Sequence, residues 1–151
     1  MSPTELQEFL HRSVPLSRAM GVAVEAITPD SVVLAAPFEQ NINQHGTVFG
    51  GSSATLSVLA AWSLLHTRLM VEGIDVKLVV QRSAMEYEAP MAGRFTATAS
   101  LPPGAHWRHF VDAIRAKGKA RIQVLAVVGS SGPPAGRFQG EFVAVREAGS
   151  A

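Results

Sequence analysis

GGSSATLSVLAAWSLLHTRLMV, the stretch from Gly50 to Val71, decides the fold of this 151-residue chain. Two glycines open the stretch, and the residues after them predict a long helix with apolar side chains on nearly every face. Such a helix must be enclosed by protein, and a curved sheet wrapped around it would enclose it. Its apolar residues are Leu56, Val58, Leu59, Ala60, Trp62, Leu64, Leu65 and Leu69.

Polar residues interrupt this stretch too often for a membrane span, which requires about 20 consecutive, predominantly apolar residues. We therefore expect a buried helix and no membrane span. The interruptions are Thr55, Ser57, Ser63, His66, Thr67 and Arg68.

The rest of the chain supplies about six strands. Turn residues separate them, as at Thr28 to Asp30 and in the expected hairpin loop from Gly129 to Gly136. Most connections are too short for parallel crossovers, so we predict an antiparallel α+β fold. The β-rich runs are Met20 to Ile27, Ser31 to Ala36, Val76 to Tyr87, Arg94 to Ser100, Ala120 to Val128 and Phe138 to Val145.

Two shorter helices complete the predicted order. The first has Thr4 as its N-cap and ends before Pro15, and the second spans Pro103 to Lys117. No internal repeat or linker divides the chain, and its length suits one domain over residues 1–151.

The composition excludes several classes of function. Hydrophobic residues make up 47% of the chain and charged residues 17%, so some apolar surface is expected to meet a partner. The net charge is +1 and the basic residues are scattered, which argues against nucleic-acid binding. There is no cysteine, which rules out disulfides and thiolate nucleophiles. The N-terminus does not have the layout of a secretory signal, so we expect a cytoplasmic protein.

The polar run before the helix, Asn41 to Gly51, carries the chemistry. Glycine lets a ligand approach the backbone closely, and the free N–H groups of Gly50 and Gly51 at the helix start can donate to a carbonyl or an oxyanion. Asn43 or His45 could then orient water or the substrate carbonyl. The alternative is that the glycines only form a tight turn and that Asn43 and His45 satisfy loop backbone groups.

The run His45-Gly-Thr-Val-Phe-Gly-Gly-Ser, followed by a helix bearing Ala-Ala-Trp62, resembles the putative thioesterase family named after the C-terminal domain of YiiD. The resemblance extends over nearly the whole chain. It includes Pro15-Leu-Ser-Arg-Ala-Met-Gly21, Gln81-Arg-Ser83, Tyr87-Glu-Ala-Pro90, Lys117-Gly-Lys-Ala-Arg-Ile122 and Phe138-Gln-Gly-Glu-Phe-Val143.

This resemblance implies a hotdog fold, in which a sheet wraps a long central helix and two subunits join their sheets edge to edge. It also implies hydrolysis of an acyl-CoA or acyl-carrier-protein thioester at a site on the homodimer interface. The CoA moiety would belong to the substrate, so no separate cofactor and no metal are expected. Two such dimers can associate further into a dimer of dimers.

The chain departs from a related group of hotdog thioesterases, the phenylacetate-pathway type, at two positions. The asparagine of that group matches Asn43, but Phe49 stands at its histidine position and Val58 at its helix carboxylate. Another group must therefore activate water, and His45 is the candidate base, since an imidazole titrates near neutrality.

Further candidates come from other segments. Ser83 is the hydroxyl of most interest, and strand alternation would place it on one face with Gln81 and Met85. Thr55 and Ser57 either converge on the helix start or bond back to their own helix. Arg121, in a local basic segment, could bind a CoA phosphate or be ordinary solvated charge. We predict catalytic roles for Asn43, His45, Gly50, Gly51 and Ser83, and substrate binding by Phe49, Thr55, Gln81 and Arg121.

Two other functions are weighed against hydrolysis. A dehydratase acting on 3-hydroxyacyl thioesters would need an Asp and His pair, and no Asp lies in this loop or helix. A hotdog domain that binds an acyl thioester or lipid without hydrolysing it is compatible with the missing helix carboxylate. A zinc site is not expected, because His106 and His109 have no third ligand at a recognisable spacing.

Overall fold

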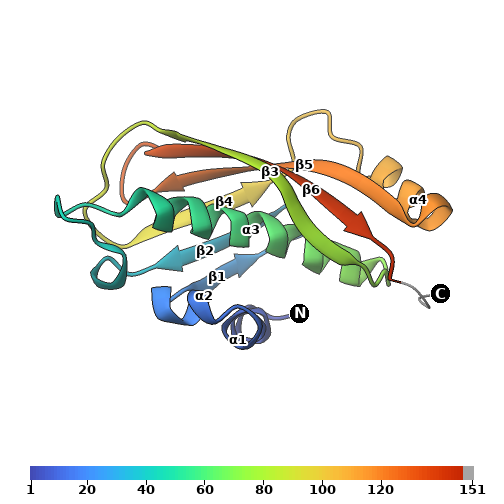
Figure 1. Cartoon of the computed structure of the whole chain (residues 1–151), viewed down its shortest axis with the longest axis horizontal. Coiled ribbons are helices and arrows are strands. Elements are labelled where there is room, and N and C mark those ends of the chain that lie inside the picture. The colour runs from blue at the N-terminus through green and yellow to red at the C-terminus, as the bar shows by residue number, and fades with distance from the viewer. Residues whose placement is uncertain (148–151) are drawn as a thin grey trace.

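The computed structural model describes residues 1–147. Six antiparallel strands form one sheet in the order β1-β2-β4-β5-β6-β3, and the long helix α3 lies across one face of it (Figure 1). The predicted antiparallel α+β architecture is confirmed. The strands are β1 (Ala23–Ile27), β2 (Ser31–Ala36), β3 (Lys77–Tyr87), β4 (Phe95–Ser100), β5 (Lys119–Gly129) and β6 (Gly136–Val145).

Helix α3 spans Gly50–Val71, as predicted, and forms the centre of the core. Leu56, Leu64 and Leu65 have no exposed surface, and they pack against the sheet beside Phe95, Phe138 and other buried residues. By length and composition the helix could cross a membrane, but 56% of its apolar 18-residue segment is buried inside the domain. The apolar character of α3 is therefore accounted for by burial in the core.

The N-terminal region differs from the prediction in two respects. Helix α1 (Pro3–Ser13) is capped by Ser2, not Thr4, because Ser2 and Glu5 form a reciprocal capping box with Pro3 in the first turn. A second short helix, α2 (Pro15–Met20), ends at Met20, the first residue of the first predicted strand. Gly21 ends α2 in the left-handed conformation, with φ 73°, so the strand begins only at Ala23.

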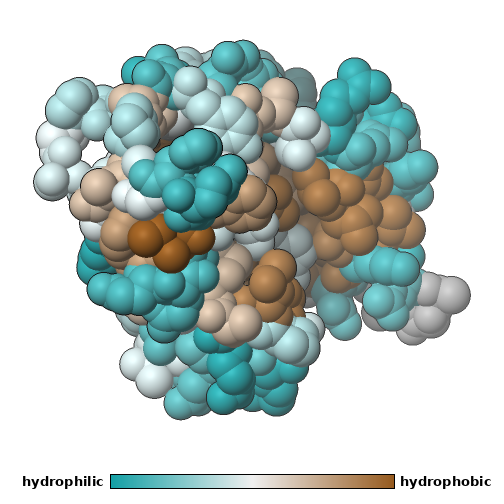
Figure 2. Space-filling view, turned by 60° about the vertical axis from the view of Figure 1, so that its left-hand side comes forward, coloured by the Kyte–Doolittle hydropathy of each residue, from teal (hydrophilic) through white to brown (hydrophobic). Residues whose placement is uncertain are grey.

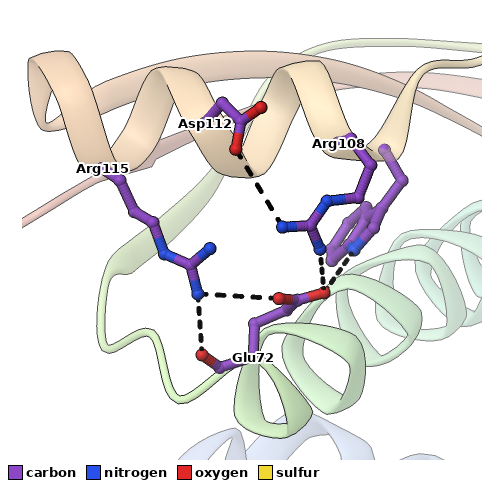
Figure 3. A network of polar contacts seen from close by, with 5 residues as sticks. Glu72, Arg108, Asp112 and Arg115 are labelled. Atoms are coloured by element: carbon purple, nitrogen blue, oxygen red, sulfur yellow. Dashed lines mark hydrogen bonds and ion pairs between the residues drawn. The ribbon is translucent and has the colours of Figure 1, made fainter.

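The connection from β4 to β5 contains helix α4 (Trp107–Lys117), which starts later than the predicted Pro103 because residues 101–106 form a loop. Helix α4 docks on the C-terminal end of α3 through Glu72 (Figure 3). The Glu72 carboxylate accepts hydrogen bonds from Trp107 Nε1 at 3.2 Å and Arg108 Nη1 at 2.8 Å, and it pairs with Arg115. These donors lower the pKa of Glu72, with the Trp107 bond as the largest cause.

Strand β3 is a long edge strand that pairs with β6 alone among the described residues. Nearly all of its side chains are exposed, including Val79, Val80 and Tyr87. Hydrophobic side chains reach the surface in several patches on the face seen in Figure 2. An uncovered edge strand with exposed apolar residues can pair with another chain.

Candidate functional site

The run from Asn41 to Gly51 folds back on itself before α3 begins. The N–H of Phe49 donates to the carbonyl of Asn41 at 2.7 Å, and the N–H of Asn43 donates to the carbonyl of Thr47 at 2.8 Å. The N–H of Val48 donates to the carbonyl of Met91 at 2.8 Å, which ties the loop to the segment before β4. The loop is thus held at its base, and its tip projects from the domain.

Asn43 organises this loop from within. Its Oδ1 accepts hydrogen bonds from the N–H of His45 at 2.9 Å, from the N–H of Thr47 at 3.1 Å and from the Thr47 hydroxyl at 3.3 Å. Its Nδ2 also lies 2.9 Å from Thr47 Oγ1. The alternative that Asn43 satisfies loop backbone groups therefore has direct structural support.

His45 lies at the exposed tip of the loop, followed by Gly46 in the left-handed conformation with φ 76°. Its ring has no hydrogen-bond partner among the described residues. The imidazole is therefore available to a substrate, but nothing in residues 1–147 orients it.

Gly50 and Gly51 form the first turn of α3, with Phe49 as the N-cap residue. The N–H groups of Ser52 and Ser53 both donate to the carbonyl of Phe49, at 2.9 and 3.2 Å. The N–H groups of Gly50 and Gly51 have no acceptor within residues 1–147. Two adjacent free donors at a helix start suit a carbonyl oxygen that gains negative charge, because the helix dipole adds to the donors' attraction.

An aromatic ring lies against each of the two glycines. A Cβ at Gly50 would lie 3.1 Å from the Tyr87 ring, and one at Gly51 would lie 2.5 Å from the Phe49 ring. The Tyr87 hydroxyl also donates to the carbonyl of Gly50 at 3.3 Å. A side chain at either position would therefore have to displace a ring from its present place, and Tyr87 joins the site although its sequence pattern gave no such indication.

Ser83 lies on β3 opposite Gly140 of β6, on the helix-facing side of the sheet. It stands between the two places where β3 meets α3, namely the bond from Trp62 Nε1 to the Leu78 carbonyl and the Tyr87 contact with Gly50. A register shift at Gln81 interrupts the strand alternation, so Val80 takes the position in phase with Ser83 and Met85. Val80, and not the expected Gln81, is therefore in phase with Ser83 along the strand.

Phe49 and Thr55 line a pocket of about 350 Å³ between α2 and the start of α3. Ser57 bonds back to the Ser53 carbonyl, whereas the Thr55 hydroxyl has no bond of this kind in the described residues. The same pocket is lined by Gly51 and by the buried Asn41. Asn41 was not among the predicted site residues, because a loop asparagine carries no sequence signal of burial.

Arg121 lies away from this site. It is exposed on β5 and, with His106 and His109, lines a separate pocket of about 510 Å³ beside α4. Helix α4 docks on the C-terminal end of α3, and the 22 residues of α3 span roughly 33 Å. Within one chain the structure therefore does not bring Arg121 to the Gly50 and Gly51 donors.

His66 lies farther along α3, outside the loop site. Its ring stacks on Trp62 and Phe9, with centroid distances of 4.6 and 5.1 Å, and its Nε2 is buried without a partner in the described residues. Burial lowers the pKa of His66 from its ordinary 6.5, and the charge of Asp75 opposes this more weakly. The neutral imidazole thus behaves as a core residue.

A six-stranded antiparallel sheet around one long helix defines a protein of the hotdog fold. The family model described as "Putative thioesterase (yiiD_Cterm)" matches residues 3–146, and the chain belongs to this family. The resemblance found in the sequence is thereby confirmed.

Several solved structures are similar to this chain over nearly its full length. A protein of unknown function from Chlorobaculum tepidum TLS is similar at 30% identity and a TM-score of 0.88, with 96% of this chain and 94% of that chain covered. A protein described as a putative thioesterase from Shewanella oneidensis is similar at 23% identity and a TM-score of 0.85, with 95% and 96% covered. A thioesterase from Haemophilus influenzae is similar at 12% identity and a TM-score of 0.77, with 97% and 92% covered.

Proposed function

We propose that this protein hydrolyses an acyl-CoA or acyl-carrier-protein thioester at a site formed between two copies of the chain. The observation that carries the proposal is the pair of free N–H groups at Gly50 and Gly51, at the start of the core helix. An oxyanion formed there would be stabilised by both donors and by the helix dipole.

In the proposed reaction, water attacks the thioester carbonyl carbon, and the carbonyl electron pair moves to the oxygen facing Gly50 and Gly51. His45 accepts the proton of the attacking water and returns it to sulfur as the carbon–sulfur bond breaks. The products are a carboxylic acid and a thiol. Ser83 and Gln81 would contact the substrate from β3, and Asn43 would act by holding the loop that carries His45.

A second copy of the chain is the proposed partner. The uncovered β3 edge supports this, because an eleven-residue strand with exposed valines would otherwise leave both backbone groups and apolar side chains in water. Tyr87 and Phe49, both more than half exposed, lie where β3 meets the start of α3. We propose a homodimer in the cytoplasm, able to associate into a dimer of dimers, with no separate cofactor.

Thiol release from a panel of acyl-CoA esters tests the activity. His45→Gln should lower kcat at least about a hundredfold if the imidazole transfers the proton. Gln44→Ala, which alters the exposed neighbour of His45, is the matched control and should retain activity. Equal rates for wild type and His45→Gln would show that His45 is not the base.

Ala84→Lys tests the interface, because a charge at this exposed position of β3 disfavours edge-to-edge pairing. The variant should sediment as a monomer and lose turnover together. A fully active monomer would contradict a site shared between subunits.

A binding domain without hydrolysis is the second candidate, and one observation favours it. Among residues 1–147, no side chain holds the ring of His45 in place, and Phe49 and Val58 occupy positions where related enzymes carry polar groups. Pure dimer that binds CoA esters but releases no thiol would support this candidate against the enzyme.

A further inference from the structure

Arg68 is a partly buried cation near the C-terminal end of α3. Its guanidinium lies over the ring of Trp107, with the central carbon 4.3 Å from the ring centroid. Within residues 1–147 this guanidinium donates no hydrogen bond and joins no ion pair. A guanidinium carries five N–H donors in one plane and stays charged in proteins. The donors of Arg68 are therefore available to an acceptor from outside the chain.

The nearby carboxylates are paired with other arginines. Figure 3 shows Arg108 and Arg115 of α4 converging on Glu72, at 2.8 and 3.6 Å from its carboxylate oxygens. Asp112, on the same helix, lies 4.0 Å from Arg108. Both carboxylates thus pair with the arginines of α4. Arg68 is left as a cation without a counter-ion among the described residues.

A pocket of about 490 Å³ lies beside Arg68, and this volume is within the roughly 300–1,000 Å³ that small-molecule sites have. Residues from the end of α3, the turn between β1 and β2 and the start of α4 line it. Among them are Arg68 and Trp107, together with the apolar side chains of Ile27 and Val71. Val71 is 89% exposed. The pocket therefore places an unpaired guanidinium next to apolar surface that water now covers.

The position of this pocket separates it from the proposed reaction site and from the proposed dimer interface. Arg68 lies 18 residues after Gly50 on α3, which is roughly 27 Å at the rise of an α-helix. The turn in the pocket wall belongs to β1, which forms the edge of the sheet opposite β3. Pairing of two β3 edges would therefore leave the pocket open.

We propose that this pocket binds a carboxylic acid with an apolar chain, whose carboxylate pairs with Arg68 and whose chain lies against Val71 and Ile27. A carboxylate accepts two parallel hydrogen bonds from a guanidinium, and stacking on Trp107 limits the orientations of the guanidinium plane. A singly charged head group is favoured over a phosphate, because the Glu72 carboxylate beside Trp107 repels a second negative charge. This site is separate from the proposed thioester hydrolysis and does not depend on it.

Titration of the nitrogen-15-labelled protein with octanoate tests the proposal by NMR. The chain has two tryptophans, so its spectrum has two indole N–H signals, and Trp107→Phe identifies which is which. Trp107 lines the pocket, whereas Trp62 donates to the Leu78 carbonyl elsewhere. Octanoate should shift the Trp107 signal and saturate the shift, which gives a Kd for this site. A shift of the Trp62 signal alone would place octanoate elsewhere and overturn the proposal.

Three further ligands separate the head group from the chain. Octan-1-ol keeps the chain without the charge, and acetate keeps the charge without the chain. Each should bind at the Trp107 signal with a Kd at least about tenfold higher than that of octanoate. Octyl phosphate carries a second negative charge and should also bind more weakly. Tighter binding of octyl phosphate than of octanoate would overturn the choice of a carboxylate.

Two variants change the two halves of the site, and a third is the control. Arg68→Gln removes the charge and should raise the Kd of octanoate at least about tenfold. Val71→Ser keeps the guanidinium and should raise that Kd about threefold, because less apolar surface is covered. Arg12→Gln is the matched control, since Arg12 also lies over an aromatic ring, that of Phe9, but does not line this pocket. It should keep the Kd of wild type.

Three results would overturn the site: no shift of the Trp107 signal, equal Kd values for octanoate and octan-1-ol, or the same Kd in wild type and Arg68→Gln. If Arg68→Gln displaces the Trp62 signal before any ligand is added, the fold has changed and Arg68→Lys takes its place. Lysine keeps the charge and loses the planar fork of donors, so an unchanged Kd in Arg68→Lys overturns the role of the guanidinium. None of these results bears on thioester hydrolysis, which thiol release measures separately.

Discussion

Tyr87 and Gly50 join the end of the edge strand to the start of the core helix. The Tyr87 hydroxyl donates to the Gly50 carbonyl at 3.3 Å, and its ring lies 3.1 Å from the position that a Cβ at residue 50 would take. The proposed oxyanion donors are thereby coupled to β3, the strand proposed to pair with the second subunit. Loss of this contact should affect turnover more than folding.

Tyr87→Phe removes the hydroxyl and keeps the ring against Gly50. Because the bond is exposed, we expect a loss of about 0.5 kcal/mol in the free energy of unfolding and a small change in kcat. Tyr87→Ala removes the ring as well and should lower kcat/KM about tenfold, or about 1.4 kcal/mol. Urea unfolding and thiol release measure the two effects, and full activity in Tyr87→Ala would show that the contact has no functional role.

Gly51→Ala places a methyl group where the Phe49 ring now lies, 2.5 Å from its nearest atom. The ring is the end of a flexible side chain, so we expect it to turn away and KM to rise, with unfolding changed by no more than about 1 kcal/mol. Phe49→Ala combined with Gly51→Ala should be less harmful than the sum of the single changes. Strictly additive effects on kcat/KM would argue against this contact.

Asn43→Ala and Asn43→Asp separate a loop-holding role from a role of the amide nitrogen. Aspartate keeps the oxygen that accepts the N–H groups of His45 and Thr47, whereas alanine leaves both donors without it. We expect Asn43→Ala to cost about 1–2 kcal/mol in unfolding and most of the turnover, and Asn43→Asp to retain much of both. Equal loss in the two variants would point to direct use of the amide.

His66→Phe tests the effect of burial on the imidazole. Because the pKa of His66 is lowered on folding, the unfolded chain binds a proton first as the pH falls below 6.5, and stability declines with it. Phenylalanine keeps the stack on Trp62 and Phe9 but has no group that binds a proton, so it removes the contribution of His66 to the pH dependence of stability. The unfolding free energy of wild type should therefore fall more than that of His66→Phe between neutral pH and the acid range. Parallel pH profiles would contradict this.

Glu72→Gln tests how α4 is held on α3. Glutamine can still accept the Trp107 bond but loses the charge that faces Arg108 and Arg115, so the Tm should fall. The difference from wild type should shrink in roughly 1 M salt, because salt screens partly exposed charges. It should also shrink as the pH falls below 4.5, since the lowered pKa of Glu72 stabilises the fold only while the carboxyl is ionised. An unchanged Tm would mean that apolar packing alone holds α4.

The sequence alone determined the central helix, the antiparallel sheet and the family. Gly50 to Val71 is apolar on nearly every face, which predicts a helix that is buried or spans a membrane, and its polar interruptions favoured burial. Alternating and β-branched runs located all six strands, and the errors fell at ends such as Met20 and Pro103, where a cap or a loop residue decides the boundary.

Only the tertiary structure decided which polar residues share a site. Asn41 and Asn43 are two residues apart and chemically identical. Within residues 1–147, however, the side-chain oxygen of Asn41 is buried without a partner, whereas that of Asn43 is engaged by its own loop. Burial and hydrogen-bond partners depend on distant segments, here Met20, Pro37 and Tyr87. Local sequence patterns record the period of an element, but they do not record which far part of the chain lies against it.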